Sequence, residues 1–148
     1  MMDLADLYRD IIVDHNRRPR NFGRLAAASH TAEGNNPLCG DKLQLFVEMK
    51  DEVIHDIRFE GAGCAISTAS ASLMSEAVKG KSRTQVADLF NGVHRMLVQR
   101  DALSDAGLGK LAALAGVREF PMRVKCASLC WHTLKAALAG TAVPVSTE

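Results

Sequence analysis

Two consecutive stretches in which apolar and polar residues alternate constrain the fold of this chain more than any other feature. Apolar residues occupy every second position over 43–49, and the alternation resumes over 53–59 with one histidine in the series. A period of two is typical of strands with one buried face. Only Lys50-Asp51-Glu52 separates the stretches, which is the length of a tight turn. The sequence therefore predicts an antiparallel hairpin, although no glycine marks its turn.

Helical periodicity lies on both sides of this hairpin. Residues 21–42 have no period and contain three glycines and a proline, so we interpret them as a loop. Because strands and helices do not alternate along the chain, the pattern favours an α+β fold over a doubly wound sheet. Apolar residues recur at helical spacing in five segments, which are 4–12, 66–77, 86–97, 111–115 and 124–138.

Length and charge narrow the class of protein. The 148 residues suit a single domain over 1–148, with residues 141–148 expected to form a loose tail. Eighteen Lys and Arg residues against 17 Asp and Glu residues give a formal net charge of +1. This small charge and the 5% content of aromatic residues argue against a nucleic-acid partner.

The expected compartment follows from two missing signals. No apolar run approaches the roughly 20 residues of a membrane-spanning helix. The first residues also lack the basic-then-apolar order of a secretory signal. We therefore expect a cytoplasmic protein with no membrane partner. In that reducing compartment, the four cysteines point to metal binding or catalysis rather than to a disulfide framework.

Three of the cysteines lie at the ends of predicted elements, where side chains can converge. Cys39 lies in a loop with proline and glycine, Cys64 follows a glycine turn at a helix start, and Cys126 lies near the start of the last helix. A helix N-terminus favours the thiolate, which is the form that binds metal or attacks sulfur. Each cysteine taken alone is equally compatible with a small buried hydrophobic residue.

Two other kinds of chemistry lack their motifs. Gly61 and Gly63 are not followed by the third glycine of a dinucleotide-binding turn or by the Lys-Ser/Thr of a phosphate-binding loop. We interpret these glycines as freedom for a tight turn that aims Cys64. The serines over 67–75 lie outside a G-x-S-x-G motif and have no evident base, so hydrolysis is unsupported.

Three separated segments of the sequence combine a cysteine with neighbouring glycine, acidic or basic residues: Asn36-Pro37-Leu38-Cys39-Gly40-Asp41, Gly61-Ala62-Gly63-Cys64-Ala65-Ile66-Ser67 and Arg123-Val124-Lys125-Cys126-Ala127. Together these three motifs resemble the iron–sulfur cluster scaffold family that contains IscU, SufU and the N-terminal domain of NifU. The opening segment over 7–23 is also similar, and the resemblance covers about residues 4 to 140. It implies a SufE/NifU-like α+β fold, in which a small antiparallel sheet of about three strands packs against about five helices.

Within this family the chain resembles the SufU branch. Lys125 stands where IscU members carry a histidine, and the segment from Cys64 to Cys126 is longer than in IscU. The resemblance implies that Cys39 receives persulfide sulfur from a pyridoxal-phosphate cysteine desulfurase, SufS-like in kind. Cys39, Cys64 and Cys126 are also suited to hold a transient [2Fe–2S] cluster, because such clusters are bound by thiolates. The resemblance also implies a zinc ion with four protein ligands, which are Cys39, Asp41, Cys64 and Cys126.

Three thiolates and one carboxylate around zinc leave an excess of negative charge. Arg123 and Lys125, which lie beside Cys126 in the last motif, either offset part of that charge or are simply solvated. Asp41 is a harder ligand than a thiolate, so it is less suited than cysteine to a permanently closed structural site. A loop cysteine in such a site is able to leave the metal and attack a persulfide.

Cys130 departs from the family pattern. It follows Cys126 by four residues, so the two lie one turn apart on the predicted helix. Two roles stay open for it. Cys130 is either a small buried helix residue or a spare thiol that accepts sulfur or forms a disulfide with Cys126.

The expected function is iron–sulfur cluster biogenesis. The chain would act as a zinc-containing sulfur carrier between a cysteine desulfurase and downstream scaffold or apo-protein acceptors, or as a scaffold for nascent clusters. Such a protein is a sulfurtransferase-like acceptor rather than a conventional enzyme. The alternative is a zinc-stabilised protein-interaction module without sulfur transfer. A cysteine redox enzyme would need C-x-x-C beside a βαβ unit, and neither is present.

Overall fold

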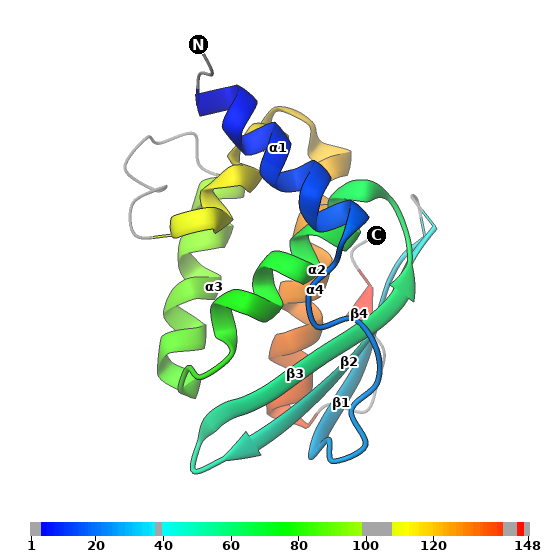
Figure 1. The fold of residues 1–148 in the computed structure, drawn as a ribbon, viewed down its shortest axis with the longest axis vertical. Helices are drawn as coiled ribbons and strands as arrows, with labels where there is room; N and C mark the ends of the chain where they lie inside the picture. Colours follow the sequence, from blue (N-terminus) through cyan, green and yellow to red (C-terminus); the bar gives the residue numbers. More distant parts are fainter. Residues whose placement is uncertain (1–3, 38–39, 99–107, 141–144, 147–148) are drawn as a thin grey trace.

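A computed structural model describes residues 4–37, 40–98, 108–140 and 145–146. In these ranges the helices cover one face of a sheet with strand order β3-β2-β1-β4 (Figure 1). The elements in chain order are α1 (Leu4–Arg17), β1 (His30–Asn36), β2 (Asp41–Lys50), β3 (Val53–Ala62), α2 (Ala65–Val78), α3 (Arg83–Val98), the 3₁₀ helix η2 (Gly109–Glu119), α4 (Pro121–Ala139) and β4 (Val145–Ser146).

The expected α+β class is confirmed. Strands β1, β2 and β3 are antiparallel neighbours, and the described residues include four α-helices and one 3₁₀ helix. The two residues of β4 pair in parallel with β1, at Gly34 and Asn35. The other residues of the expected tail, 141–144 and 147–148, lie outside the described residues. No helix in the described ranges is long and apolar enough to cross a membrane.

The predicted hairpin is formed by β2 and β3. Lys50 pairs with Val53, so the turn has two residues, Asp51 and Glu52. Both have positive φ, 54° and 63°, which is the backbone of a type I′ turn. The turn therefore forms without the glycine that usually occupies such positions.

The interpretation of residues 21–42 as a loop is wrong for His30–Asn36, which forms β1. The buried face of β1 consists of Ala32, Gly34 and Asn36. These residues alternate correctly for a strand, but they are small or polar rather than apolar. Apolar alternation alone therefore does not reveal this strand. Its inward residues carry small or polar side chains rather than the large apolar side chains that usually line a core.

Gly34 explains why the inner face of β1 is small. A Cβ at this position would collide with Thr133 Oγ1 and lie 3.0 Å from Leu129 Cδ1, both on α4. The absence of a side chain thus allows β1 to approach α4 closely. The next inward residue, Asn36, is then brought beside the N-terminal half of α4.

The core lies between the sheet and helices α2, α3, η2 and α4. Helix α4 packs against β1 and α2, and α1 covers α2 from the other side. Local sequence signals mark the helix ends: Ser82 and Gln85 form a reciprocal capping box at the start of α3, Pro121 is the first residue of α4, and Gly140 ends α4 with φ of 73°. The largest buried side chains include Leu45, Ile54, Ile57, Met74, Met96, Leu114, Leu129, Trp131 and Leu134.

Candidate metal centre

Three of the four predicted ligands converge. The ligand atoms of Asp41, Cys64 and Cys126 all lie within 4.8 Å of one another. They come from three elements: the first residue of β2, the residue before α2, and the second turn of α4. The fourth predicted ligand, Cys39, lies outside the described residues.

Asp41 is buried at the edge where β1 and β2 meet, with 1% of its surface exposed. Its direct cross-strand partner is Asn36, the last residue of β1. The Cys64 backbone N–H donates to Asp41 Oδ1 at 2.8 Å, and the Cys64 thiol lies 3.8 Å from Oδ2. Sheet pairing and this hydrogen bond together fix the carboxylate against the start of α2.

Cys64 is the N-cap residue of α2. Its sulfur accepts a hydrogen bond from the Ser67 backbone N–H at 3.4 Å, as an N-cap oxygen usually does. The helix dipole places partial positive charge at this end. The side chain is half-buried, so Cys64 combines an ordered position with access from outside.

Gly63 makes room for the carboxylate of Asp41. A Cβ built on Gly63 would lie 2.5 Å from Asp41 Oδ1 and 3.1 Å from its Cγ. Any side chain at this position would push the carboxylate out of place. Gly63 therefore serves the site in a way that the sequence does not show, because it leaves the space that the Asp41 carboxylate occupies beside Cys64.

Cys126 is buried on the inner side of α4, with 2% of its surface exposed. Asn36 Nδ2 donates a hydrogen bond to its sulfur at 3.5 Å. Asn36 was not expected at the site from the sequence, where it is only the first residue of a motif. Its position, five residues before Asp41 across a proline and glycine connection, is the signal that could have placed it at the site.

Cys130 stands apart from this cluster although it is one turn from Cys126. It is 1% exposed, its sulfur lies 3.4 Å from Ser70 Oγ, and it donates to the Ala127 carbonyl at 3.8 Å. Burial raises the pKa of the Cys130 thiol to about 12. A thiol that stays protonated is neither a metal ligand nor a nucleophile. The structure thus favours the role of a small buried helix residue.

One serine has a base beside it, contrary to the sequence analysis. Ser72 Oγ lies 2.7 Å from His15 Nδ1, and His15 Nε2 lies 3.5 Å from a Glu76 carboxylate oxygen. Ser72 is fully buried and also accepts from the Arg20 backbone N–H at 2.9 Å. No substrate can reach the hydroxyl, so these contacts fasten α1 and the segment after it onto α2.

The donor set suits zinc. In a tetrahedral zinc site with sulfur and oxygen ligands, the ligand atoms lie roughly 3.5 Å apart, which a small adjustment of atoms within 4.8 Å of one another achieves. Thiolates are the ligands that zinc and iron–sulfur clusters share, and a carboxylate is a common fourth zinc ligand. The space that Gly63 leaves for Asp41 is consistent with such a centre.

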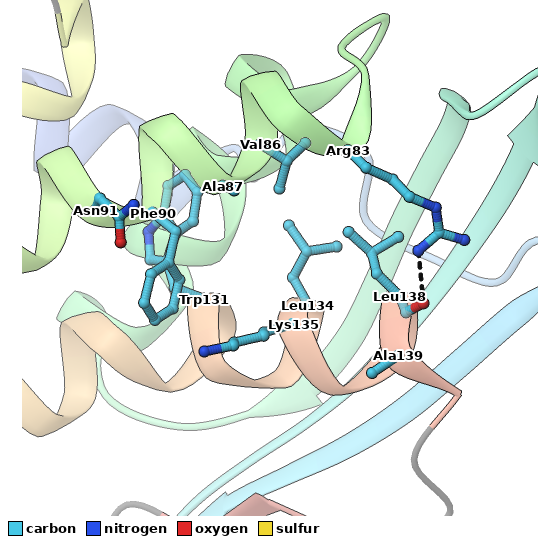
Figure 2. A pocket seen from close by; sticks show the side chains of 10 residues that line it. All are labelled: Arg83, Val86, Ala87, Phe90, Asn91, Trp131, Leu134, Lys135, Leu138 and Ala139. Carbon is cyan, nitrogen blue, oxygen red and sulfur yellow. Dashed lines mark hydrogen bonds between the residues drawn. The ribbon is translucent and has the colours of Figure 1, made fainter.

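A hollow of about 420 Å³ lies between α3 and α4 and is lined by none of the three converging residues. Figure 2 shows Phe90 and Trp131 at one end and Arg83 at the other, where the guanidinium donates to the Leu138 carbonyl at 2.6 Å. None of the described residues that line the hollow is acidic or a cysteine. The three converging residues are therefore separate from this hollow.

Fold and site together define a class: a small α+β protein with a buried thiol–carboxylate cluster at the junction of a sheet edge and two helices. Known proteins match this class. The sequence pattern of the NifU-like N-terminal domain matches residues 7–127. The chain belongs to the family of NifU-like N-terminal domains.

Curated relatives cover nearly the whole chain. The protein called zinc-dependent sulfurtransferase SufU of Bacillus subtilis is 39% identical over 137 residues, which are 93% of this chain and 92% of the relative. The protein called iron-sulfur cluster assembly scaffold protein IscU of Streptococcus pyogenes is 40% identical over 135 residues, 91% of this chain and 84% of the relative. The names of two family branches, SufU and IscU, thus occur among the relatives.

A solved structure has the same fold. The crystal structure described as a putative iron-sulfur cluster assembly scaffold protein for the SUF system, from Fervidobacterium islandicum, superposes with a TM-score of 0.80 at 33% identity. The match covers 92% of this chain and 99% of that one. The SufE/NifU-like fold expected from the motifs is therefore confirmed.

Proposed function

We propose that this chain is a zinc-containing sulfur carrier of iron–sulfur cluster biogenesis, which accepts persulfide sulfur from a cysteine desulfurase and supports the assembly of nascent clusters. The observation that carries the proposal is the convergence of Asp41, Cys64 and Cys126 within 4.8 Å. Each comes from a different motif of the family. A relative named as a zinc-dependent sulfurtransferase and others named as cluster scaffolds support both parts of the proposal.

Cys39 completes the ligand set in this proposal. It lies two residues before Asp41 in sequence, in the connection between β1 and β2. A fourth ligand from this connection would close a shell of three thiolates and one carboxylate. Bound zinc would supply a Lewis-acidic centre that keeps its cysteine ligands in the thiolate form.

The proposed sulfur transfer is a thiol–disulfide-type exchange. The Cys39 thiolate attacks the outer sulfur of the persulfide on the desulfurase cysteine, and a new S–S bond forms. The old S–S bond breaks, and the desulfurase cysteine leaves as a thiolate. The persulfide then resides on Cys39, no net oxidation or reduction occurs, and the sulfur is available to the next acceptor.

The rest of the cluster supports this role through geometry. Asp41 is buried and held by the Cys64 N–H, and Cys126 is buried beside Asn36, so both are ordered before any partner arrives. Cys64 is half-buried at a helix N-terminus. Nascent [2Fe–2S] clusters, as cargo, need thiolates that are already grouped, and Cys64 and Cys126 are grouped here.

A desulfurase assay tests the proposal. Sulfide released from L-cysteine by a pyridoxal-phosphate cysteine desulfurase is measured with and without the chain, in the presence of a reductant. We expect the wild-type chain to raise the rate several-fold and Cys39→Ser not to raise it. Mass spectrometry of the wild-type chain after the reaction, without reductant, should show one added sulfur on the peptide that contains Cys39.

Cys130→Ser is the matched control, because it also removes one thiol but lies outside the cluster. It should stimulate the desulfurase as well as the wild type does. Full stimulation by Cys39→Ser would assign the acceptor role to another thiol. A wild-type chain that binds zinc but neither stimulates the desulfurase nor gains sulfur would instead support a zinc-stabilised interaction module.

A further inference from the structure

Asn36 is a buried polar residue that directly contacts the metal centre. It is the last residue of β1, its side chain is fully buried, and its cross-strand partner is Asp41. Its Nδ2 donates to Cys126 Sγ at 3.5 Å, whereas its Oδ1 is buried and has no partner among the described residues. A buried amide oxygen without a partner costs folding free energy, so stability alone does not account for an asparagine here.

The hydrogen bonds to the other two ligands show what Asn36 supplies. Asp41 accepts from the Cys64 backbone N–H, and Cys64 accepts from the Ser67 backbone N–H. Both donors come from the start of α2, where backbone N–H groups are unused by the helix. The fold therefore gives these two ligands a donor without using a side chain.

Cys126 lies inside a helix rather than at its start. Helix α4 begins at Pro121, so Cys126 lies in the second turn, where backbone N–H groups belong to the helix ladder. Its helix has no spare backbone donor to offer at this point. The amide of Asn36 reaches the sulfur from β1, and the close approach that Gly34 allows between β1 and α4 makes that reach possible.

We propose that Asn36 is a positioning residue of the metal centre, which orients the Cys126 sulfur toward Asp41 and Cys64 and withdraws negative charge from it through an N–H···S hydrogen bond. The proposal rests on the metal binding in the proposed function. Outer hydrogen-bond partners of metal ligands typically change metal affinity by about ten- to a hundredfold. In a centre with an excess of anionic ligands, each such donor lowers the repulsion between them.

The test separates metal affinity from stability. Asn36→Leu keeps the branched shape but removes both the donor and the unpartnered oxygen. We expect the full chain with this change to bind Zn²⁺ about tenfold or more weakly in competition with a chelator. The thermal unfolding midpoint of the metal-free variant should equal or exceed that of the metal-free wild type, because an unsatisfied acceptor has been removed.

A spectroscopic readout addresses the hydrogen bond itself. With Co²⁺ in place of Zn²⁺, removal of a donor from a thiolate raises the energy of its lone pairs, so the sulfur-to-cobalt charge-transfer band should move to longer wavelength. The wild-type chain provides a second measurement that needs no variant. Its Asn36 side-chain amide proton signals in an NMR spectrum should shift when Zn²⁺ is added, since these protons face the sulfur.

Asn35→Leu is the matched control. Asn35 is the neighbouring amide, but it points to the opposite face of β1 and is only half-buried. It should leave Zn²⁺ affinity and the Co²⁺ spectrum unchanged. Unaltered affinity and spectrum in Asn36→Leu, or wild-type Asn36 signals that ignore Zn²⁺, would overturn this role for Asn36. A wild-type chain that binds neither metal would instead refute the metal binding of the proposed function.

Discussion

Cys126 and Cys130 lie one turn apart on α4 and are equally buried, yet the polar groups around their sulfurs differ. Cys126 faces an amide donor, a carboxylate and a second cysteine. Cys130 faces a serine hydroxyl and a backbone carbonyl inside the core. The contrast shows that helical spacing brings two thiols together without giving them a common function. What decides their function is which other elements reach the same point.

The largest effect expected from this contrast is on metal binding. Cys126→Ser should weaken Zn²⁺ binding more than about a hundredfold, because removing a ligand opens the shell to water. Cys130→Ala should leave the affinity and the stoichiometry unchanged. Elemental analysis and chelator competition on the folded variants measure both.

The second prediction concerns the free energy of unfolding of the Cys130 variant. Cys130→Ala removes a buried sulfur from the core and should lower the free energy of unfolding by about 1 kcal/mol. If Cys130→Ala loses zinc while it remains folded, then Cys130 is a ligand and the separation of the two thiols is wrong. Loss of sulfur transfer with intact zinc would contradict it as well.

A smaller effect on Zn²⁺ affinity than that of Cys126→Ser is expected when a residue next to the cluster is changed. In Gly63→Ala, the new Cβ would lie 2.5 Å from Asp41 Oδ1, so the carboxylate must move away from the Cys64 N–H. We expect Zn²⁺ affinity to fall about tenfold, as it does when an outer contact of a ligand is lost. Gly116→Ala is the control, since a Cβ there meets no atom within 4 Å. Equal affinities for the two variants would show that the position of Asp41 does not matter for binding.

The smallest expected effect concerns pH and isolates Cys130. Its pKa is raised from 9.0 to about 12 by burial. Between these values the unfolded chain has lost the proton and the folded chain has kept it, so stability is intact below pH 9 and falls as pH rises toward 12. The loss is at most about 1.4 kcal/mol per pH unit.

Denaturant unfolding of the metal-free chain near pH 8 and near pH 10 measures this loss. The wild type should lose about 1 kcal/mol more than Cys130→Ala over that interval, since the variant lacks the thiol and all other titrating groups are shared. Equal losses in the two chains would mean that the Cys130 thiol is solvated. In that case the two thiols of α4 would be more alike than the structure indicates.

The hairpin and the helices could be predicted from sequence, because apolar periodicity reports directly on them. The three motif segments could be recognised because they resemble those of a known family. Strand β1 could not, since Ala32, Gly34 and Asn36 carry the periodicity of a strand without its hydrophobicity. Gly34 and Asn36 contact residues of α4, so their roles become clear only from the folded structure. Gly34 is a point of contact with Thr133, 99 residues further along the chain.

The candidate site divides in a similar way. Asp41, Cys64 and Cys126 were expected from the motifs, and the structure brings their ligand atoms together. The hydrogen-bond partners were not expected. Asn36 contacts Cys126, and Gly63 lies against Asp41. These partners are distant in sequence, and no local sequence pattern indicates which distant residues will meet. The same limit left two roles open for Cys130 until its burial was known.

The origin of the three converging residues has a mechanical consequence. Asp41 precedes Cys64 by roughly 20 residues and Cys126 follows by roughly 60, so one ion bound to all three would cross-link the chain into two loops, as a pair of disulfides does. The smaller loop contains the β2–β3 hairpin, and the larger contains α2, α3 and η2. Loading the centre would therefore tether the start of β2 to α2 and α4, and unloading it would release that tether.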